Sequence, residues 1–233
     1  MKKLTTLIPG LLLGLALACG GGSHTTAPAP APPPVPAQGL TYTDPTGTGW
    51  RLVKDTSSTA TRVVLNLVGP AGLKTRGAGF NLKAPASVRF GFFTDPAAPV
   101  NNTGWPIKDT GVFELTNTDP RDPYTGDPVP PDPQDPILLA GAVKKGNLLS
   151  IGIFQKDRRA SAKDSAQPLC QIAIEFDAAA KLNAKDTIAL SIVKAKYIPE
   201  DLGAFNGGVT TWEMLAKGHP VDMTIAVGSL HAN

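Results

Sequence analysis

Residues that build catalytic and metal sites are scarce in this chain of 233 residues. It contains two cysteines, three histidines and four glutamates, and two cysteines cannot form a cysteine-based zinc site. No G-x-S-x-G elbow, phosphate-binding loop or dinucleotide fingerprint occurs. His219, in "KGHPVD", is interpreted as a loop residue. We therefore expect no enzyme activity, no catalytic residue, no metal ligand and no cofactor; a hydrolase whose site the sequence does not reveal is the alternative.

Strong charge of one sign is also missing. The formal net charge is +3, and removal of Lys2 and Lys3 with an N-terminal leader leaves 20 basic against 19 acidic residues. Nucleic-acid binding demands a basic patch that neutralises phosphates. The composition therefore argues against a nucleic-acid partner.

An apolar run long enough to cross a membrane is absent as well. Lys2 and Lys3 precede an apolar stretch, Leu4–Leu17, that is shorter than the ~20 residues of a spanning helix. Small residues, Ala16 and Ala18, then precede Cys19. This order is typical of a secretory signal peptide, which we place at residues 1–18.

The stretch "LALAC" that ends at Cys19 resembles the lipobox of bacterial lipoproteins, although Ala16 stands where that family prefers Leu. The resemblance implies a diacylglycerol on the Cys19 thiol and cleavage that leaves Cys19 as the first residue. Gly20 follows where an Asp would retain such a protein at the inner membrane, which implies the outer membrane of a Gram-negative bacterium, in either leaflet. The alternative is a secreted protein cut after Ala18, with Cys19 unmodified.

Residues 19–40 contain a stretch, Gly20–Gln38, that is rich in Gly, Ala and Pro and is expected to bury nothing. Such a composition forms a flexible and then semi-rigid tether rather than a folded element. The remaining residues, 41–233, are enough for one domain with a substantial core.

The domain consists of short apolar runs separated by Gly- and Pro-rich turns. Cys170, Ile172 and Ile174 alternate with Gln171, Ala173 and Glu175, the period of half-buried antiparallel strands. We predict an all-β fold, an antiparallel sandwich of about nine to ten strands, with one short helix near the C-terminus over Thr210–Lys217. The predicted strands are Trp50–Lys54, Arg62–Val68, Ala78–Lys83, Ser87–Phe93, Gly111–Thr116, Ile137–Val143, Leu148–Phe154, Leu169–Asp177, Thr187–Tyr197 and Asp222–Val227.

One long loop interrupts the strands. Residues 117–136 contain five Asp-Pro steps, and proline excludes this segment from a central strand. Calcium is the one cofactor that this loop suggests, because hard cations prefer carboxylate oxygens. The segment lacks a D-x-D-x-D-G loop, so a solvated insertion is the preferred interpretation.

The segments "RVVLNLVGPAGLKTRGAGFNLKAPASVRF", "GNLLSIGIFQKD" and "LCQIAIEFDAA" resemble cohesin-like domains in their hydrophobic spacing. The resemblance covers Thr61–Tyr197. It implies a jelly-roll sandwich of about nine strands, shared with related carbohydrate-binding modules, and a binding function without catalysis. The Asp-Pro-rich loop departs from that pattern, and no binding residue is carried over.

Trp50 and Trp105 each follow a Thr-Gly turn, "TGTGW" and "NNTGW", and are the candidate binding residues. Exposed tryptophans stack on sugars, whereas buried ones plug the end of a sandwich. We expect a non-catalytic envelope lipoprotein, held to the membrane by its lipid, that acts as a binding or scaffolding module for a protein partner. A carbohydrate-binding module that uses the tryptophans is the alternative.

Overall fold

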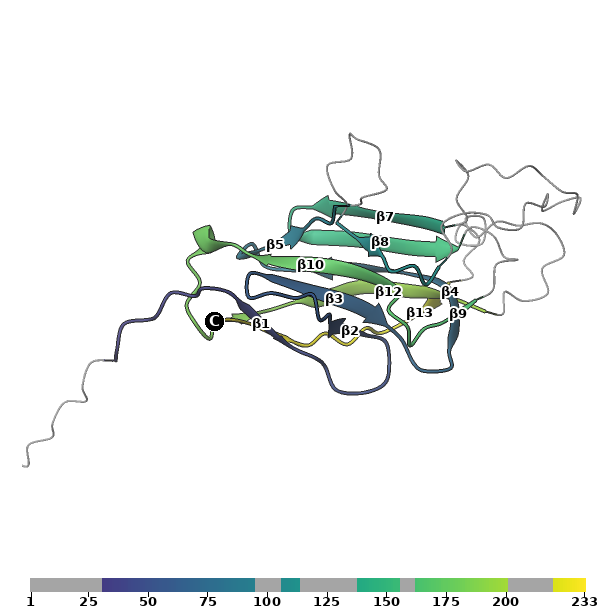
Figure 1. Cartoon of the computed structure of the whole chain (residues 1–233), viewed down its shortest axis with the longest axis horizontal. Helices are drawn as coiled ribbons and strands as arrows, with labels where there is room; N and C mark the ends of the chain where they lie inside the picture. The colour runs from purple at the N-terminus through teal and green to yellow at the C-terminus, as the bar shows by residue number, and fades with distance from the viewer. Residues whose placement is uncertain (1–30, 95–105, 114–137, 156–161, 201–219) are drawn as a thin grey trace, which may run out of the picture. The chain divides into compact units, whose positions relative to one another are not determined.

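The computed structural model describes residues 31–94, 106–113, 138–155, 162–200 and 220–233 (Figure 1). The chain divides into two compact units, Met1–Pro33 and Pro34–Asn233, and all the strands belong to the second. These strands form antiparallel sheets, so the predicted all-β class is confirmed. Within the described ranges no helix has the length and apolar character needed to cross a membrane.

The first sheet, here the β10 sheet, has the order β2-β3-β10-β5, and β6 also pairs with β10. In β10 the alternating residues Cys170, Ile172 and Ile174 are buried, as the sequence predicts, and Ile172 lies opposite Leu65 of β3. Its strands are β2 (Arg51–Lys54), β3 (Arg62–Val68), β5 (Val88–Gly91), β6 (Lys108–Asp109) and β10 (Cys170–Phe176).

The second sheet, here the β4 sheet, has the order β13-β12-β4-β8-β7, and β9 pairs with the start of β4. Ala78, Phe80 and Leu82 of β4 are buried and alternate with Gly79 and Asn81. Its strands are β4 (Lys74–Lys83), β7 (Leu138–Lys145), β8 (Leu148–Gln155), β9 (Lys163–Asp164), β12 (Ser191–Pro199) and β13 (Val221–Asp222).

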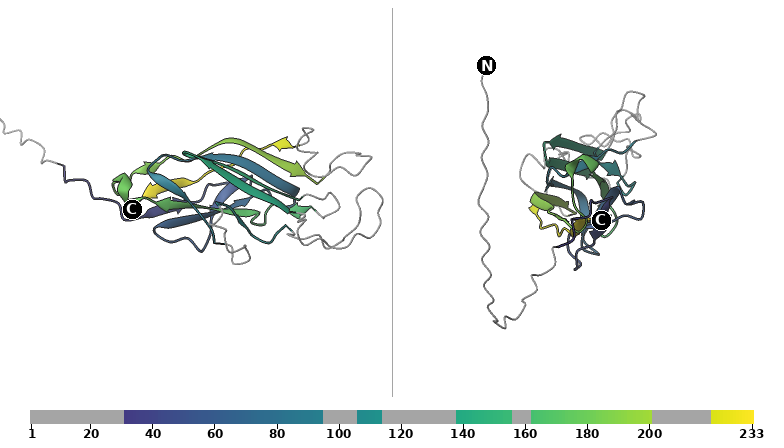
Figure 2. Two further views of the ribbon diagram at one scale, coloured as in Figure 1. Left: turned by 90° about the horizontal axis from the view of Figure 1, so that it is seen from above. Right: turned by 90° about the vertical axis from the view of Figure 1, so that its left-hand side faces the viewer.

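A small third sheet joins the two ends of the domain. β14 (Ser229–Ala232) lies between β1 (Leu40–Thr43) and β11 (Thr187–Ile188). The backbone amide of Gln38 also donates to the carbonyl of Asn233, so the N-terminal strand and the C-terminus share one end of the domain (Figure 1; Figure 2, left). Burial raises the pKa of Tyr42 to about 12, and its hydroxyl donates to the Leu52 carbonyl while accepting from the Gly228 amide.

One hydrophobic core draws buried side chains from the β10 sheet and the β4 sheet, as two layers with facing apolar sides require. It includes Leu65 and Ile172 from one layer and Leu82, Leu149 and Ile153 from the other. The buried thiol of Cys170 lies in this core, and burial together with the charge of Asp109 raises its pKa to about 12. The alternation predicted along β10 therefore located the core side of that layer correctly.

Some predicted elements differ from the structure. The continuous strand predicted over Thr187–Tyr197 is two strands, β11 and β12, because its two halves pair in different sheets. The strand predicted over Ser87–Phe93 is shorter: β5 ends at Gly91, and Phe92 is 49 % exposed. No strand covers residues 111–113, and the sequence analysis missed β1 and β14.

After β10 the chain forms the 3-10 helix η1 (Ala178–Ala180). The Asp177 side chain caps it by accepting from the Ala179 amide. The loop over 117–136 and the helix over Thr210–Lys217 lie outside the described residues.

Candidate functional site

The outward side of the β4 sheet, here called the open face, is a platform of small, polar and basic residues. Its strands β7, β8 and β4 are in register, and β12 pairs with β4 with a register shift between Ile192 and Lys194. Successive outward rows are about 7 Å apart along β7, β8 and β4. Across the sheet the rows are Lys145–Leu148–Lys83–Ser191, then Val143–Ser150–Asn81–Lys194, then Gly141–Gly152–Gly79–Lys196.

A row of glycines lies at the centre of this face. Gly141, Gly152 and Gly79 stand opposite one another on three neighbouring strands. The ring of Phe154 covers two of them: a Cβ at Gly152 would lie 2.6 Å from its Cε2, and one at Gly79 would lie 3.1 Å from its Cζ. The glycines therefore let an aromatic ring lie directly on the sheet, and β-branched residues here would displace it.

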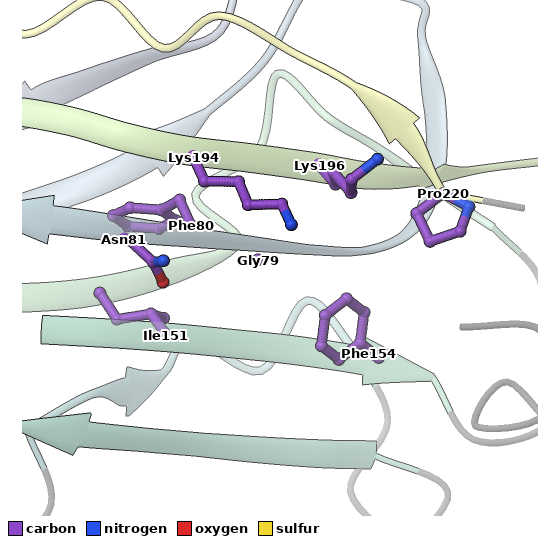
Figure 3. A pocket seen from close by; sticks show the side chains of 8 residues that line it. All are labelled: Gly79, Phe80, Asn81, Ile151, Phe154, Lys194, Lys196 and Pro220. Atoms are coloured by element: carbon purple, nitrogen blue, oxygen red, sulfur yellow. The ribbon is translucent and has the colours of Figure 1, made fainter. Parts of the chain in front are cut away.

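Next to that ring the surface is hollowed, with a volume of about 200 Å³ (Figure 3). Phe154 and Pro220 lie toward one end, and Asn81, Lys194 and Lys196 contribute polar and charged groups. Such a mixture of apolar walls and a few convergent polar groups suits one inserted side chain better than a large substrate.

Two lysines, Lys194 and Lys196, border the hollow from β12. Lys196 Nζ lies 2.8 Å from Asp222 Oδ1 on β13, and this pairing lowers the pKa of the exposed Asp222 carboxyl. Lys83, Lys145 and Lys194 are exposed, as are Val143 (69 %) and Val193 (62 %). The open face thus combines exposed apolar side chains with a frame of positive charge.

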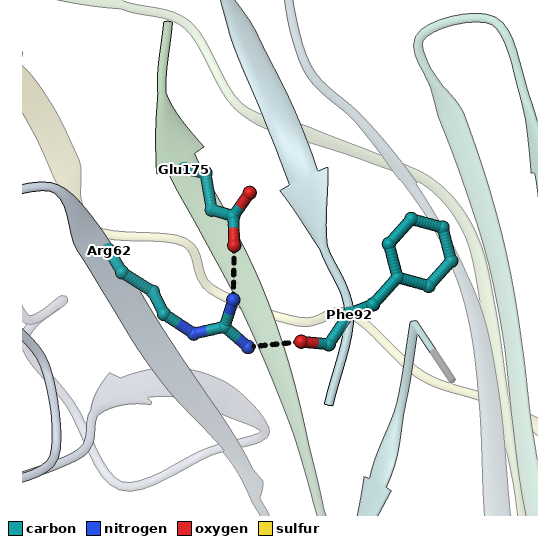
Figure 4. Close-up of polar contacts among 3 residues, drawn as sticks. All are labelled: Arg62, Phe92 and Glu175. Carbon is teal, nitrogen blue, oxygen red and sulfur yellow. Dashed lines mark hydrogen bonds and ion pairs between the residues drawn. The ribbon is translucent and has the colours of Figure 1, made fainter. Parts of the chain in front are cut away.

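The outward side of the β10 sheet, here called the closed face, is different. Arg62 ion-pairs with Glu175, donates to the Phe92 carbonyl at 2.7 Å, and lies 4.9 Å from the centre of the Phe93 ring (Figure 4). Gly91 makes room for this pair, because a Cβ there would lie 2.6 Å from both the guanidinium and the carboxylate.

A second polar cluster continues the closed face. Asn66 is 6 % exposed; its amide donates to Asp55 at 2.8 Å, and its oxygen accepts from Gln171 at 3.0 Å. Hydrogen bonds from Ser57 and from Asn66 lower the pKa of the Asp55 carboxyl. Beside these groups Val64 and Ala173 are buried although they point away from the core.

Of the two candidate tryptophans, Trp50 lies within the described residues. Trp50 is 6 % exposed and packs against Tyr197 with ring centroids 5.4 Å apart, so the described structure places it in the core. Trp105 and Cys19 lie outside the described residues. Among the residues that are described, no three His, Cys, Asp or Glu side chains cluster as a metal site requires.

Sequence reasoning missed the residues of the open face. Gly79, Gly152 and Phe154 lie within predicted strands, yet their alignment depends on how β4 pairs with β8. The signal that could have found them is a glycine two residues or one residue before a phenylalanine in each of two predicted strands, "GAGF" and "IGIF".

No family model and no curated protein matches the chain. Among solved structures, it is similar to the sixth cohesin of Acetivibrio cellulolyticus scaffoldin B, solved in complex with Cel5 dockerin, at 12 % identity and a TM-score of 0.41, covering 78 % of this chain and 97 % of that chain.

A non-cellulosomal cohesin from Archaeoglobus fulgidus matches at 11 % identity and a TM-score of 0.37 over 78 % of this chain and 87 % of that chain. The cohesin module of a Clostridium perfringens family 33 glycoside hydrolase matches at 9 % identity and a TM-score of 0.34, covering 84 % of this chain and 99 % of that chain. These matches are all cohesin domains, and at such TM-scores they establish no equivalence between individual residues.

Proposed function

We propose that this domain is a non-catalytic binding module that docks a protein partner on the open face of its β4 sheet. The observation that carries the proposal is the contrast between the two outward faces. Arg62, Phe93 and the Asp55 cluster line the closed face, where Val64 and Ala173 are buried. On the open face, by contrast, Val143, Val193 and the hollow beside Phe154 are accessible.

This composition suits a protein interface. An accessible apolar centre within a polar, charged rim is the usual anatomy of such a surface. The glycine row lets a partner approach the backbone closely, and the hollow accepts a single anchoring side chain of the kind that dominates binding energy. The serines of the described rows of the open face, Ser150 and Ser191, have no histidine in those rows to activate them, so the same geometry supports binding rather than catalysis.

The test is site-specific photo-crosslinking in the bacterium's own envelope. A photoreactive phenylalanine analogue at position 150, on the open face, should give one discrete adduct with a second protein. The same analogue at position 89, where the side chain is 59 % exposed on the other sheet, should not give it. Equal adducts from both positions, or none from position 150, would remove the proposal.

We further propose that Cys19 is lipidated and tethers this module to the outer membrane. Support comes from the lipobox-like "LALAC" and from the Gly- and Pro-rich stretch that follows it. Several acyl chains on one residue anchor a protein stably, whereas a single chain is marginal. Intact mass of the membrane-extracted protein should show a chain that begins at Cys19 with acyl groups, and Cys19→Ala should abolish both the acyl mass and membrane retention.

A further inference from the structure

The open face is one-sided in charge as well as accessible. Strands β4, β7, β8 and β12 together contain seven basic residues, three on β4, two on β7 and two on β12, and no acidic one. The remaining strands of the sheet, β9 and β13, add one basic residue, Lys163, and two acidic ones, Asp164 and Asp222. The sheet therefore carries eight basic and two acidic residues, in a chain that has 22 basic and 19 acidic residues.

Two arginines of the closed face are paired with carboxylates, whereas three of the four lysines in the described rows of the open face are not. Arg62 pairs with Glu175, and Arg89 Nε lies 3.8 Å from Asp177 Oδ2. On the open face Lys196 has Asp222 as its partner, but within the described part of the chain Lys83, Lys145 and Lys194 form no ion pair. Their charge is available to a ligand.

The register fixes where these charges lie. Lys145 and Lys83 stand on either side of Leu148 in the first row, while Lys194 and Lys196 continue along β12 through the next two rows. Rows one and three are about 13 Å apart, so the lysines frame the apolar centre rather than form one point charge. Complementary charge around an apolar centre sets the orientation and the association rate of a partner.

We propose that the partner of the open face is an acidic protein surface, with carboxylates opposite Lys83, Lys145 and Lys194 and one apolar side chain in the hollow beside Phe154. This inference rests on the proposed function and adds the chemistry of the partner. A protein fits better than an anionic membrane, because the hollow of about 200 Å³ and the glycine row favour a protruding side chain on a shaped surface.

The test is an NMR titration of the mature full-length chain with poly-L-glutamate, and with poly-L-lysine as the opposite-charge control. Poly-L-glutamate should shift the amide signals of Asn81, Ser150 and Gly152 at low salt and not at 300 mM salt, where surface charges are screened. The double variant Lys83→Glu/Lys194→Glu should weaken this binding about tenfold or more. The matched control Lys54→Glu/Lys181→Glu makes the same change in net charge at two exposed residues outside the β4 sheet and should change affinity less than about threefold.

Two results would overturn the inference. One is equal weakening by both double variants, which would show that only net charge matters. The other is tighter binding of the open face to vesicles of anionic phosphatidylglycerol than to poly-L-glutamate. The photo-crosslink separates this inference from the proposed function. If the adduct at position 150 survives Lys83→Glu/Lys194→Glu, the proposal of an acidic partner is rejected and that of the docking face stands. If no adduct forms at position 150 in the chain without these substitutions, the proposal of the docking face is itself rejected.

Discussion

The two large sheets of this domain share one core, yet the side chains on their outward faces are buried to different extents. The β10 sheet carries Val64, Val68 and Ala173 on its outer side, and all three are at most 4 % exposed. The β4 sheet carries Gly79, Gly152 and Asn81 on its outer side, in rows that also contain lysines. The β10 sheet is therefore buried on both of its sides, and the β4 sheet is buried only on the side that faces the core.

The difference follows from side-chain size. Valines on an outer face expose apolar area unless something lies over them, and burying a valine contributes ~1.5 kcal/mol or more. Glycines expose almost no side chain, and their backbone groups are already paired within the sheet, so leaving them uncovered costs little. A sheet with a glycine row can therefore present a binding surface without a large loss of stability.

Thiol accessibility should separate the two layers by the largest factor. In a Cys19→Ala background, the native Cys170 should react with a thiol reagent at least about 1,000-fold more slowly than a cysteine placed by Val143→Cys on the open face. Cys170 is buried with its pKa raised to about 12, and the thiolate is the reactive form. Rates followed at pH 8 with and without urea give the comparison; reactivities within tenfold of each other in the folded protein would contradict it.

Introducing a lysine should give the second-largest difference between the two faces, in the free energy of unfolding. Ala173→Lys places an ammonium where the side chain is fully buried, so we expect a loss of about 3 kcal/mol or more in the free energy of unfolding. Val143→Lys, at a position that is 69 % exposed, should change it by less than about 0.5 kcal/mol. Urea denaturation measures both. Ala173→Leu separates the effect of size from that of charge, and similar losses for the two lysine variants would mean that the closed face is not closed.

Removing a native cation should also destabilise the protein more on the closed face than on the open face, and this difference should be smaller than that between the two lysine variants. Arg62→Ala removes an ion pair, a bond to a backbone carbonyl and a ring contact on a half-buried side chain, and should cost about 1–2 kcal/mol. Lys196→Ala removes one exposed pair and should cost less than about 0.5 kcal/mol. Thermal and urea unfolding of both variants test this, with Glu175→Gln as a conservative control; equal effects would place the two faces in the same class.

Much of the fold could be predicted from the sequence because period-two alternation is a local signal. It placed Cys170, Ile172 and Ile174 in the core and their alternates outside it. The same signal failed over Thr187–Tyr197, where one continuous alternation spans two sheets and a register shift lies between Ile192 and Lys194. Strand pairing across the sheet decides such breaks, and alternation alone does not report it.

The elements that were missed depend on long-range pairing. β1 and β14 are four residues each, and they exist because Leu40–Thr43 pairs with Ser229–Ala232 at the other end of the chain. The open face is a similar case: Gly79 and Gly152 look like weak points of two strands until the register sets them side by side. Trp50 is a different case, because a tryptophan after a turn fits both a binding residue and a core residue. The structure buries it.

The smallest effect concerns two carboxyl groups whose pKa values are both lowered, for different reasons. Asp55, on the closed face, accepts hydrogen bonds from two neutral groups, the Ser57 hydroxyl at 2.6 Å and the Asn66 amide at 2.8 Å. Asp222 instead accepts a hydrogen bond from the charged ammonium of Lys196, whose charge lowers the pKa further. Because salt screens exposed charges far more than it weakens hydrogen bonds, 1 M NaCl should return the pKa of Asp222 toward its ordinary value near 3.8 and leave that of Asp55 low. Carboxyl NMR titration measures both, with Asn66→Ala expected to raise the pKa of Asp55 alone. A folded-state pKa below the unfolded one contributes stability above about pH 3.8 that is lost as the pH falls further, so at high salt this acid sensitivity should come from Asp55 and not from Asp222. If both values moved together with salt, the closed face would be held by charge rather than by hydrogen bonds, and the contrast between the two faces would be one of degree.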